Sequence, residues 1–265
     1  IFRANSLLTV HLRFSRLPPA HDAASASHLL PMLSPPERER CARLPGVHAR
    51  RAVLARALVR TELASALNVA PATLAFVAGR HGKPVLLDPP QPIAFNLSHS
   101  GDWAVLAWLM GSAKARVGVD IEHRAAGERD VMRLARRYFS AAEQRALEKL
   151  EGGAQEALFY RLWTLKEAWV KAHGLALAPQ LGAVSFSLDA GLLRVTNRTD
   201  HASGRLLHGE VATGVWASLC LLGNGVLGDG LQPHAVEARI GAPLSEWSPM
   251  SMRDWSDSIE GSHPV

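Results

Sequence analysis

Three carboxylates in two acidic segments are the residues of this sequence best suited to chemistry. Asp120 and Glu122 are two apart at the end of an apolar run, so on a strand both leave one face while Ile121 points the other way. Glu167 belongs to a second segment that begins at Trp163. A set of oxygen ligands favours magnesium or manganese over zinc. Because magnesium most often neutralises phosphates, the three residues predict phosphate chemistry.

The helix expected to carry Glu167 has two different faces. An apolar stripe at helical spacing predicts its core-facing side: Leu158, Leu162, Leu165 and Trp169. Glu167 and Lys171 lie one turn apart on the opposite side. Taken alone, they would be interpreted as a common surface ion pair worth a few tenths of a kcal/mol. Only their combination with Asp120 and Glu122 favours a functional pair.

A third segment, Phe95–Ser100, adds two hydroxyls and an imidazole at an expected strand end. Ser98 and His99 are of types that bind phosphate, together with backbone donors. An isolated histidine in a turn is more often satisfied by the backbone. A strand end that carries two hydroxyls and an imidazole is nevertheless suited to holding a phosphate.

Periodicity and turn signals predict the elements that position these residues. Ser34 and Glu37 form a capping-box pattern at a helix start. The other expected elements of the first block are a strand at 7–14, a helix at 47–67, a basic turn at 79–84, and strands at 93–97 and 103–109 separated by 98–102. Four arginines of the 47–67 helix form either a solvated face or a binding surface: Arg50, Arg51, Arg56 and Arg60.

A second block repeats the order strand, helices, strands. Its expected elements are a strand at 115–121, helices at 129–138, 141–150 and 156–173, and strands at 183–188 and 215–222. The repeated order therefore indicates two similar halves, 1–113 and 114–240. In the tail, 241–265, periodicity fades and serine, proline and glycine become frequent, which is typical of a mobile segment.

Composition limits the partners and the compartment. The 265 residues carry a formal net charge of +5, which favours anionic partners without choosing among a phosphate-rich small molecule, an acidic protein and nucleic acid. Cys41 and Cys220 imply no disulfide framework, so we expect buried thiols in a reducing compartment. No apolar run approaches the ~20 residues that cross a bilayer, and the opening stretch does not suit a signal peptide. We predict a cytoplasmic protein with no membrane partner.

Five short motifs follow one another in a fixed order. They are Gly82–Pro84, Phe95–Ser100, Gly118–Glu122, Tyr138–Glu143 and Trp163–Gly174, preceded by the basic segment Ser34–Cys41. In this order they resemble the 4′-phosphopantetheinyl transferases of the long, single-chain, surfactin-synthetase-activating type. The resemblance covers 34–222. One departure is Glu37, since many relatives have a basic residue there.

The resemblance implies a pseudo-dimer of two α+β halves, with coenzyme A in the cleft between them. It also implies an activity: the 4′-phosphopantetheine arm of coenzyme A moves to a serine hydroxyl of an apo acyl or peptidyl carrier protein, and adenosine 3′,5′-bisphosphate is released. Such an enzyme depends on magnesium or manganese. We expect it to act as a monomer that binds no nucleic acid.

The resemblance further implies roles for individual residues. The metal ligands would be Asp120, Glu122 and Glu167. The contacts to coenzyme A would be Lys171 on the diphosphate, Ser98 and His99 on phosphates with His99 near the 3′-phosphate, and Lys83, Arg51 and the further candidate Arg40 at the adenosine end. We interpret Glu167 as the general base, while the sequence leaves Glu122 and Lys171 open for that role.

Two other classes of function remain as alternatives. Clustered carboxylates with a lysine also serve metal-dependent nucleases and phosphatases. Against this, Lys171 follows Glu167 by four residues on a helix instead of two along a strand. A basic, non-enzymatic binding module is the third interpretation. Aromatic residues, at 6%, are few for a stacking surface and are not interleaved with a basic strand.

Overall fold

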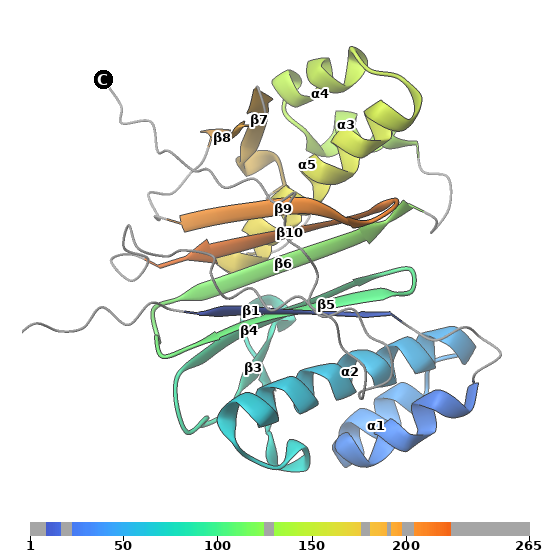
Figure 1. The fold of residues 1–265 in the computed structure, drawn as a ribbon, viewed down its shortest axis with the longest axis vertical. Helices are drawn as coiled ribbons and strands as arrows, with labels where there is room; N and C mark the ends of the chain where they lie inside the picture. The colour runs from blue at the N-terminus through green and yellow to red at the C-terminus, as the bar shows by residue number, and fades with distance from the viewer. Residues whose placement is uncertain are drawn as a thin grey trace, which may run out of the picture.

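The computed structural model describes residues 9–16, 23–124, 130–175, 181–189, 192–197 and 204–223. Helices and sheets of these ranges form an α+β arrangement in which the sheets lie between helices (Figure 1). This arrangement is consistent with the α+β class that the resemblance implies. The expected tail, 241–265, lies outside the described residues. Within the described ranges, every helix is too short or too polar to pass through a bilayer.

The first half contains a three-stranded antiparallel sheet and the helices on one of its faces. The sheet has the order β1-β5-β4, from β1 (Val10–Arg16), β4 (Ile93–Ser100) and β5 (Trp103–Met110). The helices are η1 (Ala23–Met32), α1 (Pro35–Ala42) and α2 (Gly46–Leu67), followed by η2 (Pro71–Thr73) and η3 (Arg80–Gly82). A small hairpin joins β2 (Phe76–Ala78) to β3 (Pro84–Leu86).

The second half contains another three-stranded antiparallel sheet, in the order β6-β10-β9. Its strands are β6 (Arg116–His123), β9 (Gly204–Ala212) and β10 (Val215–Leu222). The helices between β6 and β9 are α3 (Val131–Tyr138), α4 (Ala141–Glu148), α5 (Gly152–His173) and η5 (Leu181–Ala183). A second small hairpin joins β7 (Ser185–Asp189) to β8 (Leu192–Asn197).

Both sheets have the same strand order. In each half, the first strand pairs with the last one, and helices separate the first strand from the final hairpin.

Alternation along the strands explains how the halves meet. Val105 and Ala107 of β5 share one core with Val117 and Val119 of β6, while Leu106, between the first two, packs in the cluster that contains α2 residues. The two sheets therefore bury one face against each other and the other face against a helix.

Helix α1 begins where the sequence predicts. The Glu37 carboxylate accepts hydrogen bonds from the backbone amide and the hydroxyl of Ser34, at 2.9 and 3.0 Å. The same carboxylate binds Arg60 of α2, with Nε 2.7 Å from Oε2. Arg60 is only 2% exposed. The interpretation of the α2 arginines as a solvated face is therefore wrong for Arg60. Glu37 thus ties α1 to α2, which gives this acidic residue a structural purpose.

The most consequential difference from the expected elements lies in β4. The sequence predicts that this strand ends at Leu97, because serine and glycine follow, whereas the structure extends it to Ser100. The turn contains only Gly101 and Asp102, with Gly101 at φ 57°, a conformation that glycine adopts without strain. Ser98 and Ser100 are buried there, since hydroxyls with partners are tolerated inside a strand.

Candidate active site

Both acidic residues of the first segment lie on the face of β6 that is turned toward α5. Asp120 and Glu122 alternate along β6 with Val119 and Ile121, whose side chains enter the core between the sheets. Asp120 is 3% exposed, and Glu122 is partly buried. The predicted placement of two carboxylates on one face of a strand, with Ile121 on the other, is confirmed.

Helix α5 is buried on both of its faces. Leu162, Leu165 and Trp169 of the expected apolar stripe are buried as predicted. Glu167, on the other side, is only 8% exposed because that side lies against β6. The interpretation of Glu167 and Lys171 as a surface ion pair is therefore wrong. The pattern of α5 alone could not reveal a second partner for this helix.

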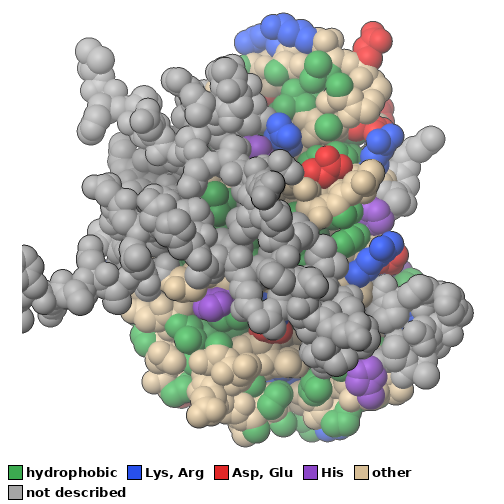
Figure 2. All heavy atoms as spheres, in the orientation of Figure 1, with side chains coloured by type: hydrophobic (Ala, Val, Ile, Leu, Met, Phe, Trp, Pro, Cys, Tyr) green, Lys and Arg blue, Asp and Glu red, His purple; other side chains and the backbone are tan. Residues whose placement is uncertain are grey.

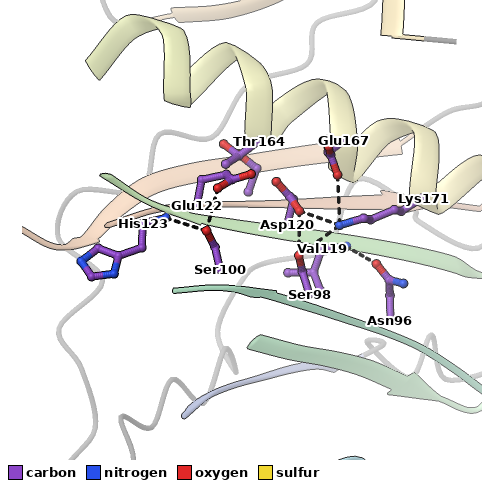
Figure 3. A network of polar contacts seen from close by, with 11 residues as sticks. Asn96, Ser98, Ser100, Val119, Asp120, Glu122, His123, Thr164, Glu167 and Lys171 are labelled. Atoms are coloured by element: carbon purple, nitrogen blue, oxygen red, sulfur yellow. Dashed lines mark hydrogen bonds and ion pairs between the residues drawn. The ribbon is translucent and has the colours of Figure 1, made fainter. Parts of the chain in front are cut away.

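Lys171 is the centre of a network that joins the two halves (Figure 3). Its ammonium nitrogen lies 2.5 Å from Asp120 Oδ1, 3.3 Å from Glu167 Oε2 and 3.0 Å from Ser98 Oγ. Ser98 accepts this bond from Lys171 and donates its own proton to Asp120 Oδ1 at 2.7 Å. The network thus brings together one residue of β4, one of β6 and two of α5.

Two further side chains of β4 bind β6 beside this network. Ser100 Oγ donates to Glu122 Oε2 at 2.7 Å and accepts from the backbone amide of His123 at 3.1 Å. Asn96 Oδ1 accepts the backbone amide of Val119 at 2.8 Å. The period-two alternation of β4 directs Asn96, Ser98 and Ser100 to the same face (Figure 3).

Burial and crowding of charge alter the acidity of the network. Burial, followed by the effect of nearby Asp120, raises the pKa of Glu167 to about 7. Burial also raises the pKa of Asp120, although the ammonium of Lys171 opposes the shift. For Lys171, burial alone would lower the pKa, but Asp120 and Glu167 outweigh it and raise the pKa. Asp120 and Glu167 therefore share the single positive charge of Lys171.

The acidic side chains at this site are of the kind that binds a hard divalent cation. Asp120 Oδ2 is buried without a hydrogen-bond partner. The atoms available as metal ligands are carboxylate and hydroxyl oxygens, which Mg²⁺ and Mn²⁺ prefer. Within the described ranges, no three His, Cys, Asp or Glu side chains are already arranged to hold an ion. Lys171 lies between Asp120 and Glu167 instead. A cation would have to share the carboxylates with Lys171 or replace it.

The basic candidates of the first half lie apart from this cluster, with one exception. Arg51 is bound to Asp102 in the β4–β5 turn, with 3.3 Å between Nη2 and Oδ1. Arg40 is exposed on α1, and its Nε donates to the Pro36 carbonyl at 3.3 Å. The exception is Lys83, which reaches the second half, where its ammonium donates to two backbone carbonyls.

His99 does not join the carboxylate network. It is exposed and alternates with Ser98 and Ser100, so its side chain leaves the opposite face of β4. Opposite His99 in the sheet lies Ala104, which packs in the cluster with residues of α2. The structure therefore separates Ser98 from its neighbour His99.

Sequence reasoning identified Ser98 but missed Asn96 and Ser100 as residues that hold the acidic strand. Their signal was present, because the three polar residues alternate through an otherwise apolar segment. A second missed contact is the hydrogen bond between the buried hydroxyls of Thr164 and Ser218, with 2.8 Å between the oxygens. Nothing in their local sequences pairs α5 with β10 at this point.

The fold and the site together describe a class of protein: an α+β protein in which buried acidic residues and a lysine of the second half contact the first half. Comparison with known families identifies the class more closely. The family described as "4′-phosphopantetheinyl transferase superfamily" matches residues 116–221, and the one described as "4′-phosphopantetheinyl transferase, N-terminal" matches residues 20–110. The chain belongs to the 4′-phosphopantetheinyl transferases, and it is an enzyme of this family.

Curated relatives support the same assignment. A 4′-phosphopantetheinyl transferase of Bacillus subtilis is 32% identical over 167 residues, which are 63% of this chain and 71% of that protein. The transferase Sfp of Bacillus subtilis is 29% identical over 190 residues, which are 71% of this chain and 81% of that protein. The transferase HetI of a Nostoc species is 31% identical over 176 residues, which are 65% of this chain and 73% of that protein. The long, single-chain type expected from the motifs is confirmed.

Proposed function

We propose that this enzyme transfers the 4′-phosphopantetheine arm of coenzyme A to a serine hydroxyl of an apo acyl or peptidyl carrier protein, releasing adenosine 3′,5′-bisphosphate. One observation carries the proposal. Lys171 lies between Asp120 and Glu167, and Asp120 retains an unpartnered buried oxygen. A site with this deficit of positive charge suits a cation, and the bound cation would in turn attract the diphosphate of coenzyme A.

We propose further that the two halves, 1–113 and 114–240, form a pseudo-dimer with the active site between them. Their shared strand order supports this division. The network in Figure 3 supports the location, because Ser98 of the first half binds Asp120 of the second. We assign no role to the tail, 241–265.

Asp120, Glu122 and Glu167 would hold Mg²⁺ or Mn²⁺. A bound divalent cation would neutralise negative charge on the transferring phosphate. Lys171 would bind the diphosphate through its ammonium group. Glu167 is our candidate for accepting the proton of the attacking serine. Glu122 and Lys171 remain the alternative bases.

The other predicted contacts extend the site toward the nucleotide. Ser98 and His99 would bind phosphates of coenzyme A, with His99 near the 3′-phosphate. Arg51 and Lys83 would contact the adenosine end, and Arg40 is a further candidate there. Lys83 donates two hydrogen bonds to protein carbonyls, so one of the three N–H groups of its ammonium remains for a ligand.

Mass spectrometry of a carrier protein tests the proposal. Incubation of the enzyme with coenzyme A, magnesium and an apo carrier should add about 340 Da to the carrier, the mass of the transferred arm. The reaction should stop when a chelator removes the metal and resume when magnesium is restored. A panel of fatty-acid, polyketide and peptide-synthetase carriers, compared by kcat/KM, would identify the preferred substrate. No mass gain on any of these carriers with folded enzyme would refute the proposal.

The two alternatives predict different outcomes of similar assays. A phosphodiesterase would release nucleotides from DNA or RNA, and a basic binding module would bind nucleic acid in a salt-sensitive way without affinity for coenzyme A. Figure 2 gives no support to the basic binding module. On the described part of the face that it draws, Lys and Arg side chains are scattered among Asp and Glu. We propose a monomer in the cytoplasm, a reducing compartment in which Cys41 and Cys220 would form no disulfide.

A further inference from the structure

Lys83 connects the first half to both elements that carry the acidic site. It follows η3 and precedes β3, in the loop of the small hairpin. Its Nζ donates to the backbone carbonyl of Val117 and to that of Lys171, each at 2.9 Å. Val117 belongs to β6, and Lys171 to the last turn of α5. One ammonium group of the first half thus holds a strand and a helix of the second.

The position of the Lys171 carbonyl makes this contact favourable. Carbonyls in the last turn of a helix lack intrahelical amide partners and carry the negative end of the helix dipole. The backbone amide of Gly174 also reaches the Lys171 carbonyl, at 3.2 Å, where Gly174 ends the helix at φ 62°. Lys83 therefore caps the C-terminal end of α5 from another part of the chain.

The contact lies where α5 and β6 approach most closely. Gly118 follows Val117, and a Cβ atom at Gly118 would overlap backbone atoms of Ala168 and Ala172 in α5. The functional side chains of α5 project from this same stretch. Any movement of the C-terminal end of α5 away from β6 would thus change the distance from Lys171 and Glu167 to Asp120.

We propose that Lys83 is a positioning residue, which fastens the C-terminal end of α5 to β6 and so sets the approach of Lys171 and Glu167 to Asp120. The expected effect on turnover rests on the proposed transferase function. The environment of Lys83 agrees with an enclosed structural role, because burial and then the nearby charge of Lys171 lower its pKa to about 8. A residue that served only to hold coenzyme A would need no carbonyl partners on two elements.

Replacement of Lys83 separates positioning from ligand binding. Lys83→Met keeps the aliphatic stem and removes both hydrogen bonds, whereas Lys83→Arg keeps donors for the carbonyls. Lys149→Met is the matched control, since Lys149 is exposed at the C-terminal end of α4. Three quantities are measured for each: kcat and KM for coenzyme A with a carrier protein, and the hydrogen–deuterium exchange rate of the peptide covering 168–175.

Lys83→Met should lower kcat at saturating coenzyme A by about tenfold or more, with a smaller change in KM, and should accelerate exchange at 168–175 by about tenfold. Lys83→Arg should recover part of the kcat and part of the protection from exchange, and Lys149→Met should match the unaltered enzyme in both. Unchanged exchange, with only KM for coenzyme A raised, would overturn the proposal. Exchange at 103–110 reports whether each variant is folded. If the unaltered enzyme modified no carrier, the transferase function would fail, and exchange alone would decide the role of Lys83.

Discussion

The properties of single residues at this site arise from an imbalance of charge. The ammonium of Lys171 contacts Asp120 and Glu167, Glu122 follows Asp120 by two residues on β6, and Asp120 is almost fully buried. Such a cluster is costly to keep ionised, because burial and like charges both favour the neutral acids. Buried ionisable clusters of this kind are frequent at functional sites. A bound cation would offset the energetic cost of keeping the carboxylates ionised.

Removal of one carboxylate should abolish catalysis while the fold persists. We expect Asp120→Asn or Glu167→Gln to lower kcat/KM by about 100-fold or more, since both remove a candidate metal ligand, and each tenfold corresponds to about 1.4 kcal/mol. Glu148→Gln, at the exposed end of α4, is the control and should retain activity. Carrier modification and thermal unfolding would be measured for each. Retention of most activity in both site variants would contradict the assignment of metal ligands.

Stability of the metal-free protein should depend on pH through Glu167. Its pKa is about 7 in the folded protein and 4.5 ordinarily, so the folded state binds more protons between these values. The contribution of Glu167 to the free energy of unfolding is therefore complete below about pH 4.5 and is lost as pH rises through about 7. Addition of magnesium should restore stability at the upper end of this range.

The measurement requires a difference between two proteins, because other groups titrate in the same window. His208 acts in the opposite direction: burial and then Arg161 lower its pKa to about 4, so its contribution is lost as pH falls from 6.5 toward 4. Urea denaturation of the unaltered protein and of Glu167→Gln, at several pH values without metal, isolates the Glu167 contribution. Parallel pH profiles for the two proteins would show that Glu167 does not titrate as described.

At the scale of elements, the site depends on how closely α5 approaches β6. Gly118 permits the contact, because its missing side chain leaves room for the backbone of α5. The hydroxyls of Thr164 and Ser218 connect α5 to β10 further along the same sheet. Buried Lys166, bound to Glu143 at 2.9 Å, anchors the other side of α5 to α4. Helix α5 is therefore fixed on both sides, which determines where Glu167 and Lys171 lie.

Gly118→Ala tests the close approach directly. The new methyl group would overlap backbone atoms of α5, so we expect a loss of about 1–3 kcal/mol in the free energy of unfolding and a large loss of activity. Gly153→Ala is the matched control. A Cβ atom there meets no atom within 4 Å, and alanine in a helix is favoured over glycine by about 0.5–1 kcal/mol. Equal stability of the two variants, measured by urea denaturation, would contradict this account.

At the scale of the whole molecule, side-chain hydrogen bonds from β4 connect the two halves, whose sheets share no backbone pairing in the described part of the chain. β4 and β6 belong to different sheets, yet Asn96, Ser98 and Ser100 each bind β6. Together with the core shared by the two sheets, these bonds make the halves one unit. The candidate site residues come from both sides of this junction, so its geometry is a condition for the proposed activity.

Asn96→Ala should destabilise the whole molecule and not just one half. The variant leaves the buried amide of Val119 without its acceptor, which costs about 1–3 kcal/mol. Thr73→Ala is the control, because the Thr73 hydroxyl forms only an exposed local bond to Ala70, and we expect a change within about 0.5 kcal/mol. Urea unfolding would be followed by fluorescence and circular dichroism together. A cost confined to one of two separate transitions would contradict the view that the halves unfold together.

The sequence by itself determined the local features of this protein. Periodicity and capping residues predicted most helices and strands to within a few residues, as at Ser34, and alternation placed Asp120 and Glu122 on one face. Ordered motifs identified the family. These features depend on neighbours along the chain, for which spacing and residue type are sufficient.

Only the tertiary structure decided which distant groups meet. The same spacing that suggests a surface ion pair at Glu167 and Lys171 belongs to a buried network, because β6 lies against that face of α5. His99 and Ser98 are adjacent in sequence yet leave opposite faces of β4, and Lys83 reaches carbonyls 34 and 88 residues away. Local patterns carry no information on the partner of a helix or strand, since packing selects it from the whole chain.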